Sequence, residues 1–306
     1  MNPDQPFRIV HVNIRGIRAN RQNLIEFLRK RNFPEIVTIN ESKLNAAVSY
    51  SLPNYYIAAR RDSSHGHHGS LILVKASVKN VVSIDNLRNL SEEVIGIRMN
   101  GSNQTPSLNI CTYYNPPRQF VKPEVFSSLK NLSGPTLLLG DVNCKNEFWG
   151  STKDNRQGNH LLEILNDNQF IVLNNSQKTR YSPQSGKEET LDIAICNTEA
   201  LRYFQNFHVD EGIGSDHYPI LLSLALNTSD TNDTYRNIKV TDWNHYQERL
   251  INIQTPQLST ATEIDNCINQ LANDIIQAFH SACPEKTRRL GKKTSFTIEM
   301  RQCVKE

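Results

Sequence analysis

Short apolar runs alternate with segments of helical periodicity over residues 7–226 of the chain. The runs are rich in Leu and β-branched residues, and Gly, Pro or Asn stands at many of their borders, which predicts β-strands. The predicted strands are residues 7–13, 35–40, 69–75, 93–98, 108–114, 136–140, 190–196 and 217–226. Because these strands are strongly apolar, we expect one or both of their faces to be covered.

Helical segments separate some of these strands. Residues 20–31 and 158–168 each carry their Leu and Phe side chains on one helical face, and residues 123–132 form a less regular candidate. Many strands with interspersed helices predict an α/β or α+β layered core.

The pattern changes after Leu226, where a polar segment without apolar anchors predicts a linker. Further on, Thr260 and Glu263 have the spacing of a capping box. They open an amphipathic stripe that ends before Pro284 and consists of Ile264, Ile268, Leu271, Ile275 and Phe279. A single helix cannot bury such a stripe alone, so we expect it to pack against another surface.

These changes divide the chain into three parts. We predict a main domain over residues 1–226, a polar linker over residues 227–240 and a helical connector with a basic tail over residues 241–306. The apolar runs are far shorter than the roughly 20 residues of a membrane helix. The N-terminus has no signal-peptide pattern. We therefore expect an intracellular protein without a membrane partner.

Composition excludes several other classes of protein. A chain of 306 residues with 38% hydrophobic and 21% charged residues is too apolar to be disordered. Its six Cys are scattered without CxxC spacing, so neither a disulfide framework nor a zinc site is indicated.

Charge is unevenly distributed. The net charge is +3, but residues 286–305 hold seven Lys and Arg against one Glu, which gives +6 there and −3 in the remainder. A second basic cluster comprises Arg15, Arg18, Arg21, Arg29, Lys30 and Arg31. Basic edges on an acidic body are compatible with a carboxylate site that acts on a polyanion, although ordinary solvated surface charge explains the counts equally well.

Polar residues gather at the ends of the predicted strands. They are Asn13, Glu41, Tyr114, Asp141 with Asn143, and Asp216 with His217. Asp192 is different, because it lies inside an apolar strand between Leu191 and Ile193. A bare buried carboxylate is costly, so Asp192 needs a partner.

Taken in order, these elements resemble the endonuclease–exonuclease–phosphatase superfamily. More closely, they are similar to the apurinic-type endonuclease domain of insect LINE-type (non-LTR) retrotransposons of the jockey sort. The resemblance covers residues 7–226 and rests above all on Gly140-Asp141-x-Asn143, on Phe-Trp-Gly-Ser at 148–151, and on Ser-Asp-His at 215–217. It implies an α/β fold, a four-layer sandwich of two mixed β-sheets flanked by helices, with a C-terminal helical extension.

The segment after residue 240 resembles the connector that leads toward reverse transcriptase in such elements. The sequence has no Tyr-x-Asp-Asp polymerase motif, so we expect the chain to stop before any polymerase. Pro117 stands where apurinic repair enzymes have Asn after Tyr-x-Pro, which favours the retroelement type over abasic-site repair.

The chemistry implied is hydrolysis of a phosphodiester. It requires charge neutralisation at the phosphoryl oxygens, an activated water and help for the departing alkoxide. Mg²⁺, with Mn²⁺ as an alternative, suits such a site because it binds oxygen ligands and keeps several waters. Glu41 is the best candidate ligand, supported by Asn13, with Asp216 as a further ligand.

The resemblance also implies the remaining roles. Asp141 would orient and deprotonate the attacking water, and Asn143 and Tyr114 would hydrogen-bond the phosphate. His217 would contact the phosphoryl group as an imidazolium or act as acid or base, and Asp192 would fix its orientation.

Each of these residues alone also has a purely structural explanation, as a turn former, a packed aromatic or a core histidine. The structural explanation would have to hold at all six positions together. Thr179 and Thr190 also stand where hydroxyl residues are frequent in these endonucleases, although exposed strand threonines are an equal alternative.

The expected function is therefore that of a Mg²⁺-dependent DNA endonuclease. It would nick one strand and leave a 3′-hydroxyl that primes reverse transcription. DNA is the expected partner, along with a reverse transcriptase domain in the parent element, and the expected location is the nucleus when the enzyme is active. The alternatives are a superfamily phosphatase that acts on a lipid or inositol phosphate, and a decayed copy that binds DNA without cutting it.

Overall fold

The structure is a computed structural model. It describes residues 6–63, 67–88, 90, 93–101, 106–226, 234–235, 240–253, 261–284 and 286–287. The chain divides into two compact units, Met1–Thr228 and Ser229–Glu306.

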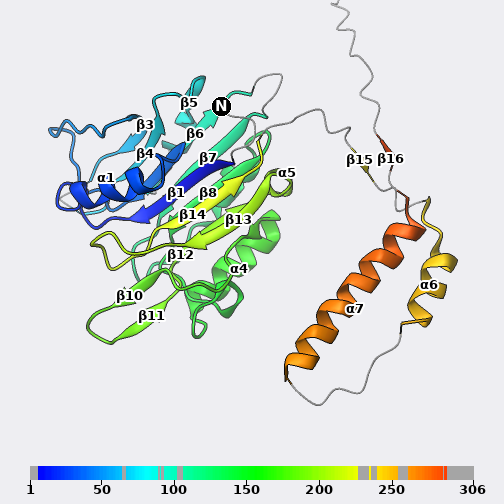
Figure 1. The fold of residues 1–306 in the computed structure, drawn as a ribbon. Helices are drawn as coiled ribbons and strands as arrows, with labels where there is room; N and C mark the ends of the chain where they lie inside the picture. The colour runs from blue at the N-terminus through cyan, green and yellow to red at the C-terminus, as the bar shows by residue number, and fades with distance from the viewer. Residues whose placement is uncertain are drawn as a thin grey trace, which may run out of the picture. The chain divides into compact units, whose positions relative to one another are not determined.

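The first unit contains two six-stranded mixed sheets (Figure 1). In the first sheet, β1 and β2 are parallel and every other neighbouring pair is antiparallel. The order is β13 (Phe204–Val209), β14 (Ile220–Leu224), β1 (Phe7–Asn13), β2 (Ile36–Asn40), β4 (Ser70–Lys75) and β3 (Tyr55–Arg61).

The second sheet is built in the same way. Its parallel pair is β7 with β8, and its other pairs are antiparallel. The order is β5 (Val81–Ser83), β6 (Glu93–Met99), β7 (Leu108–Tyr114), β8 (Thr136–Asp141), β12 (Asp192–Cys196) and β9 (Ile171–Val172). A separate hairpin consists of β10 (Arg180–Ser182) and β11 (Lys187–Glu189).

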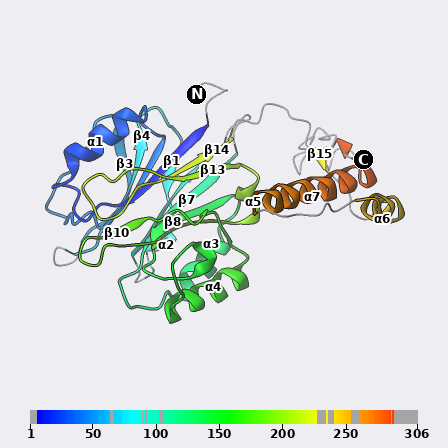
Figure 2. The ribbon, with the colours of Figure 1, turned by 60° about the horizontal axis from the view of Figure 1, so that its bottom comes forward.

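Helices cover the outer faces of both sheets, as Figure 2 shows from a second side. Leu24, Phe27 and Leu28 of α1 (Arg21–Lys30) pack on Val10, Val12 and other outward residues of the first sheet. The second sheet is covered by α3 (Pro123–Lys130) and α4 (Arg156–Asn168). Shorter helices are α2 (Asp85–Arg88), η1 (Glu147–Trp149) and α5 (Thr198–Leu201). The α/β four-layer sandwich that the sequence predicts is confirmed.

The space between the two sheets changes character along the strands. In a strand, alternate residues share a face, so one set of each central strand faces the other sheet. In the first part of each central strand the residues that face the other sheet are apolar, and they include Ile9, Ile36, Ile110 and Leu137 of the core between the sheets. Toward one edge this set becomes polar but stays buried, with His11 and Asn13, Thr38 and Asn40, Thr112 and Tyr114, Asp141, and Asp192. The fold thus builds a buried polar site at one edge of an apolar core.

The second unit contains α6 (Trp243–Ile251), α7 (Ala261–Ala282) and a short pair of strands, β15 (Thr234–Tyr235) and β16 (Lys286–Thr287). The predicted C-terminal helices are present, and Tyr246 of α6 meets Phe279 of α7 edge to face. Ile268 and Ile275 of the predicted stripe are exposed. Most of the linker, Thr260 of the capping box and nearly all of the basic tail lie outside the described residues.

Within the described part of the chain, none of the helices combines the length and the apolar character that a membrane span requires.

Candidate active site

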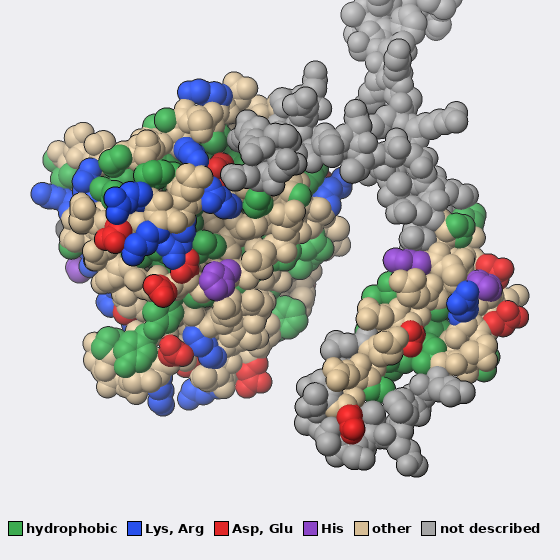
Figure 3. All heavy atoms as spheres, in the orientation of Figure 1, with side chains coloured by type: hydrophobic (Ala, Val, Ile, Leu, Met, Phe, Trp, Pro, Cys, Tyr) green, Lys and Arg blue, Asp and Glu red, His purple; other side chains and the backbone are tan. Residues whose placement is uncertain are grey.

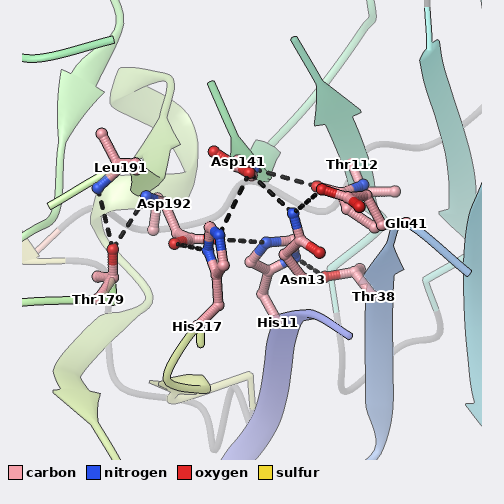
Figure 4. Close-up of polar contacts among 12 residues, drawn as sticks. His11, Asn13, Thr38, Glu41, Thr112, Asp141, Thr179, Leu191, Asp192 and His217 are labelled. Carbon is pink, nitrogen blue, oxygen red and sulfur yellow. Dashed lines mark hydrogen bonds and ion pairs between the residues drawn. The ribbon is translucent and has the colours of Figure 1, made fainter. Parts of the chain in front are cut away.

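Asn13 connects the two sheets at the polar edge of the sandwich. Its Nδ2 group donates to Oε1 of Glu41 at 2.8 Å and to Oδ2 of Asp141 at 2.8 Å (Figure 4). Asn13 ends β1, Glu41 directly follows the neighbouring β2, and Asp141 ends β8 of the other sheet. Two carboxylates far apart in the sequence are therefore held on one amide group.

Asn40 also connects the two sheets next to Asn13. Its Oδ1 accepts from the backbone N–H of Asp141 at 3.1 Å, and its Nδ2 donates to Ser70 and Thr112 at 3.1 Å each. Asn40 is fully buried. The end of β8 is thus tied to the first sheet through hydrogen bonds that leave no donor of this amide unused.

Asp141 is a buried carboxylate whose two oxygens are both bound. Oδ2 accepts from Asn13, and Oδ1 accepts from the backbone N–H of Asn143 at 3.1 Å. Burial, together with the charge of Asp192, raises the pKa of Asp141, although the opposite charge of His217 acts against this. A carboxylate with a raised pKa is a stronger base than a solvated one, which suits a group that takes a proton from water.

His217 and Asp192 form a buried pair on the opposite side of this cluster. Nδ1 of His217 donates to Oδ2 of Asp192 at 2.7 Å, and its Nε2 lies 3.8 Å from Oδ2 of Asp141. Burial alone would lower the pKa of His217, but the charges of Asp192 and Asp141 raise it to about 9. The ring is therefore an imidazolium at neutral pH, with its Nε2–H on the side of Asp141.

Thr179 positions the Asp192 end of the pair. Its hydroxyl oxygen accepts from the backbone N–H groups of Leu191 and Asp192 at 3.0 Å each. Thr190 donates to the carbonyl of Gly150 at 3.0 Å. Both threonines are fully buried, so neither is an exposed strand residue.

His11 is a site residue that the sequence does not reveal. Its Nδ1 lies 3.0 Å from the hydroxyl of Thr38, and its Nε2 lies 3.6 Å from Oδ1 of Asp192, an ion-pair distance and not a hydrogen bond. The Asp192 carboxylate thus lies between two imidazoles. Burial would raise its pKa, but His217 and His11 lower it well below the usual range, so Asp192 remains ionised.

Tyr114 and Asn143 complete the cluster. Tyr114 is buried, and its hydroxyl hydrogen-bonds the carboxylate of Glu41. Burial and the charges of Glu41 and Asp141 raise the pKa of Tyr114, so its hydroxyl keeps its proton. The Nδ2 group of Asn143 donates to the backbone carbonyl of Asn115 at 3.0 Å. Glu41 (φ 48°) and Asn143 (φ 50°) both adopt left-handed backbone conformations, which for non-glycine residues are frequent at functional sites.

Asp216 is the one predicted site residue whose carboxylate is engaged elsewhere. Its Oδ2 lies 2.9 Å from NH1 of Arg15 and accepts from Nε of Arg180 at 2.9 Å. It contacts neither Glu41 nor Asn13 in the hydrogen bonds and ion pairs of the described residues. The structure therefore brings Asn13, Glu41, Tyr114, Asp141, Asp192 and His217 together and places Asp216 beside them.

Comparison with known proteins supports the same interpretation of this fold. Residues 108–221 match the family described as endonuclease-reverse transcriptase. The endonuclease domain of TRAS1, a telomere-specific non-LTR retrotransposon, aligns over 72% of this chain and 99% of its own length, with a TM-score of 0.62 and 18% identity. The chain therefore shares the fold of that endonuclease domain, and its residues 108–221 resemble the endonuclease-reverse transcriptase family.

Other relatives show the same fold or a similar sequence. An AP endonuclease, LMAP from Leishmania major, aligns over 73% of this chain and 89% of its own length, with a TM-score of 0.61 and 14% identity. The RNA-directed DNA polymerases from the mobile element jockey are 23% identical over 212 residues in Drosophila funebris and 22% over 278 residues in Drosophila melanogaster. These matches cover 69% and 89% of this chain.

The chain spans only 23% and 30% of the length of these two curated relatives. The resemblance to the endonuclease domain of a jockey-like non-LTR retrotransposon, which the sequence motifs predict, is confirmed.

Carboxylates are the groups of this site that could hold a metal ion. Within the described residues, ligand atoms of Asp141, Asp192 and His217 lie within 4.8 Å of one another. A protonated imidazole has no free lone pair for a metal, and His217 is held in that form. Glu41, Asp141 and Asp192 with one imidazolium leave a formal charge of −2, which a divalent cation beside Glu41 would offset.

Proposed function

We propose that this chain is a Mg²⁺-dependent DNA endonuclease that nicks one strand by hydrolysis and leaves a 3′-hydroxyl. The observation that carries the proposal is the buried Asp141 carboxylate, hydrogen-bonded through Asn13 to Glu41 and 3.8 Å from the His217 imidazolium. This arrangement combines a base, a candidate metal ligand and a cationic proton donor within one hydrogen-bonded cluster. In a parent element with a reverse transcriptase domain, the 3′-hydroxyl would serve as the primer, and the enzyme would act in the nucleus.

Glu41, with Asn13 supporting it, is the proposed metal site. The donor set fits a hard cation, because the Glu41 carboxylate is half-buried and is oriented by N–H and O–H donors from Asn13 and Tyr114. When bound, Mg²⁺ would neutralise charge on the phosphoryl oxygens and on the departing alkoxide.

Asp141 is the proposed base. Its raised pKa allows it to accept a proton from water at near-neutral pH, and Asn13 and Asn143 hold both its oxygens in a fixed orientation. His217 would place its Nε2–H against a phosphoryl oxygen, and Asp192 keeps that ring charged and aligned. Tyr114 and Asn143 would then bind the phosphate by exchanging their present partners, Glu41 and the carbonyl of Asn115.

Nicking of supercoiled plasmid DNA with added Mg²⁺ tests the proposal, with EDTA as the metal-free control. We expect relaxed circles whose nicks a DNA polymerase can extend directly, since extension requires a 3′-hydroxyl. Release of inorganic phosphate from inositol phosphates without nicking would replace the proposal with a phosphatase. Salt-sensitive binding without cleavage would replace it with a DNA-binding protein.

Glu41→Ala tests the metal site in the same assay. Removing the only proposed carboxylate ligand should raise the Mg²⁺ concentration for half-maximal nicking about tenfold or more. Glu26→Ala is the matched control, because Glu26 is an exposed acid on α1 that pairs with Lys30. An identical metal titration for Glu41→Ala and wild type would remove Glu41 from the metal site.

A further inference from the structure

Asp216 holds two arginines with one carboxylate. NH1 of Arg15 and Nε of Arg180 both lie 2.9 Å from Oδ2, and the Asp216 side chain is only 8% exposed. Its second oxygen, Oδ1, is buried and has no hydrogen-bond partner among the described residues. The accessible side of this carboxylate is therefore already occupied by guanidinium groups.

The backbone on both sides fixes this arrangement. Arg15 follows Asn13 in the turn after β1, with φ 49°, and its N–H donates to Oδ1 of Asn13 at 3.2 Å. Arg180 begins β10, and Tyr181 donates its N–H to the carbonyl of Asp216 at 2.9 Å. The hydroxyl of Ser215 donates to the carbonyl of Asn13 at 2.7 Å and so connects the segment of Asp216 to the segment of Arg15. The two arginines thus come from segments that also hold the candidate active site.

Two guanidinium groups on one carboxylate leave a net charge of +1. The Arg15 side chain is 49% exposed and that of Arg180 is 31% exposed, so both keep N–H donors that face solvent. A guanidinium group donates in a planar fork that matches phosphate oxygens. In Figure 3, Lys and Arg side chains gather around α1, with Asp and Glu side chains between α1 and the β10–β11 hairpin.

We propose that Arg15 and Arg180, held side by side by Asp216, bind a backbone phosphate of DNA next to the phosphodiester that is cut, and that Asp216 is a positioning residue and not a metal ligand. The proposal rests on the proposed endonuclease function. The bound phosphate is a neighbour of the cleaved one because Asp216 directly precedes His217 in the chain. Contacts of this kind position the strand without reading its sequence.

A metal at Asp216 would have to displace existing contacts. Oδ2 is shared by two cations, and Oδ1 is closed off from solvent. Burial would raise the pKa of Asp216, but His217, Arg180 and Arg15 lower it, so the Asp216 carboxylate is ionised. These contacts distinguish Asp216 from Glu41, whose carboxylate faces neutral donors.

DNA binding without cleavage tests the arginine pair. The full chain carrying Asp141→Asn is titrated into a fluorescein-labelled duplex at several salt concentrations, with and without Arg15→Ala or Arg180→Ala. Each replacement should weaken binding about tenfold, and should reduce the slope of log affinity against log salt by about one, the loss of one phosphate contact. Arg180→Lys should restore the slope, because it keeps the charge.

Arg29→Ala is the matched control. Arg29 is an exposed arginine in the last turn of α1. This end of α1 lies beside the start of β1, because Arg8 of β1 donates to the carbonyl of Arg31 directly after the helix. Arg29 lies at the opposite end of β1 from Asn13, so its replacement should leave the slope unchanged. Slopes for Arg15→Ala and Arg180→Ala equal to that of the parent protein would overturn the proposal.

Metal titration tests the role of Asp216. In the otherwise wild-type chain, Asp216→Asn should raise KM for nicking while leaving the Mg²⁺ concentration for half-maximal rate unchanged. A shift as large as that of Glu41→Ala would make Asp216 a metal ligand and overturn the assignment. If the wild-type protein binds DNA but never nicks, the endonuclease function fails, and the salt slopes still decide the phosphate site.

Discussion

Asp141 is a buried, hydrogen-bonded carboxylate. Replacement by Asn removes its charge and keeps the shape of the side chain. Asp141→Asn should reduce single-turnover nicking by about 10²- to 10⁴-fold, the range that general-base catalysis contributes. The melting temperature should change little, because removal of a buried charge with a raised pKa is offset by the loss of one hydrogen bond, since both oxygens of Asp141 accept from N–H donors. Asp167→Asn, at an exposed position on α4, is the control. Nicking close to the wild-type rate would exclude Asp141 as the base.

Asp192 should set the alkaline limit of the proposed nicking reaction. Its charge is the largest influence that raises the pKa of His217, which reaches about 9. His217 is therefore an imidazolium below about pH 9 and neutral above it. The wild-type rate should fall as the pH rises through that value. Asp192→Asn should move this alkaline limb toward neutral pH.

The profile of kcat/KM between pH 6 and 10 at saturating Mg²⁺ measures this shift. Glu35→Gln is the control, because Glu35 pairs with Arg8 and Lys75 next to the start of β2, away from the site. Coincident alkaline limbs for Asp192→Asn and wild type would show that His217 does not carry the essential proton.

Single residues differ in how far the sequence reveals them. Asp141 and His217 stand in motifs at the ends of predicted strands, and Asp192 is an acid between apolar residues. Each of them differs from its neighbours in the sequence, so the sequence alone marks them as candidates. His11 stands inside β1 and Asn40 ends β2, and neither belongs to one of these motifs. Their contacts with Asp192 and Asp141 exist only because the second sheet stacks on the first, which no local pattern encodes.

At the scale of elements, Gly140 explains why a glycine precedes Asp141 at the end of β8. A Cβ atom there would lie 1.9 Å from the backbone carbonyl oxygen of Tyr113 in the neighbouring strand β7. Gly140→Ala should therefore destabilise the protein by about 1–3 kcal/mol, the usual penalty for overpacking. It should also lower nicking, because it shifts the strand end that carries Asp141.

Urea unfolding followed by far-UV circular dichroism measures the loss. Gly212→Ala is the control, because the nearest atom to an added Cβ there is 3.4 Å away on the side chain of Tyr218. A free energy of unfolding for Gly140→Ala within error of wild type would mean that β7 and β8 tolerate the extra atom.

Strands buried on both faces are predicted well, and strands at the edges are not. β2, β7 and β12 are buried at every position, and their apolar runs mark them. β3 and β13 are mostly half-buried or exposed, and their arginines or polar residues break the apolar run that marks a strand in the sequence. The predicted strand 217–226 also began too early, since β14 starts at Ile220, after Pro219, which has no N–H to donate.

At the scale of the whole molecule, the candidate site depends on the stacking of the two sheets of the first unit. Each sheet contributes the ends of its parallel pair, β1 with β2 and β7 with β8. The three cores of the first unit contain only residues up to Leu226 among those described. The boundaries 1–226, 227–240 and 241–306 stay a prediction from the sequence, and a shortened chain tests them.

A chain of residues 1–228 should fold and nick DNA without the second unit. Its melting temperature should lie within about 2 °C of the full chain, because no core residue is lost. The value of kcat should be unchanged, since every proposed catalytic group remains. KM should rise at low salt, because residues 286–305 carry a charge of +6, and the difference should shrink as salt screens DNA contacts. A shortened chain that melts more than 10 °C lower would place part of the core beyond residue 228. One that folds normally but has lost kcat would give the second unit a direct part in catalysis.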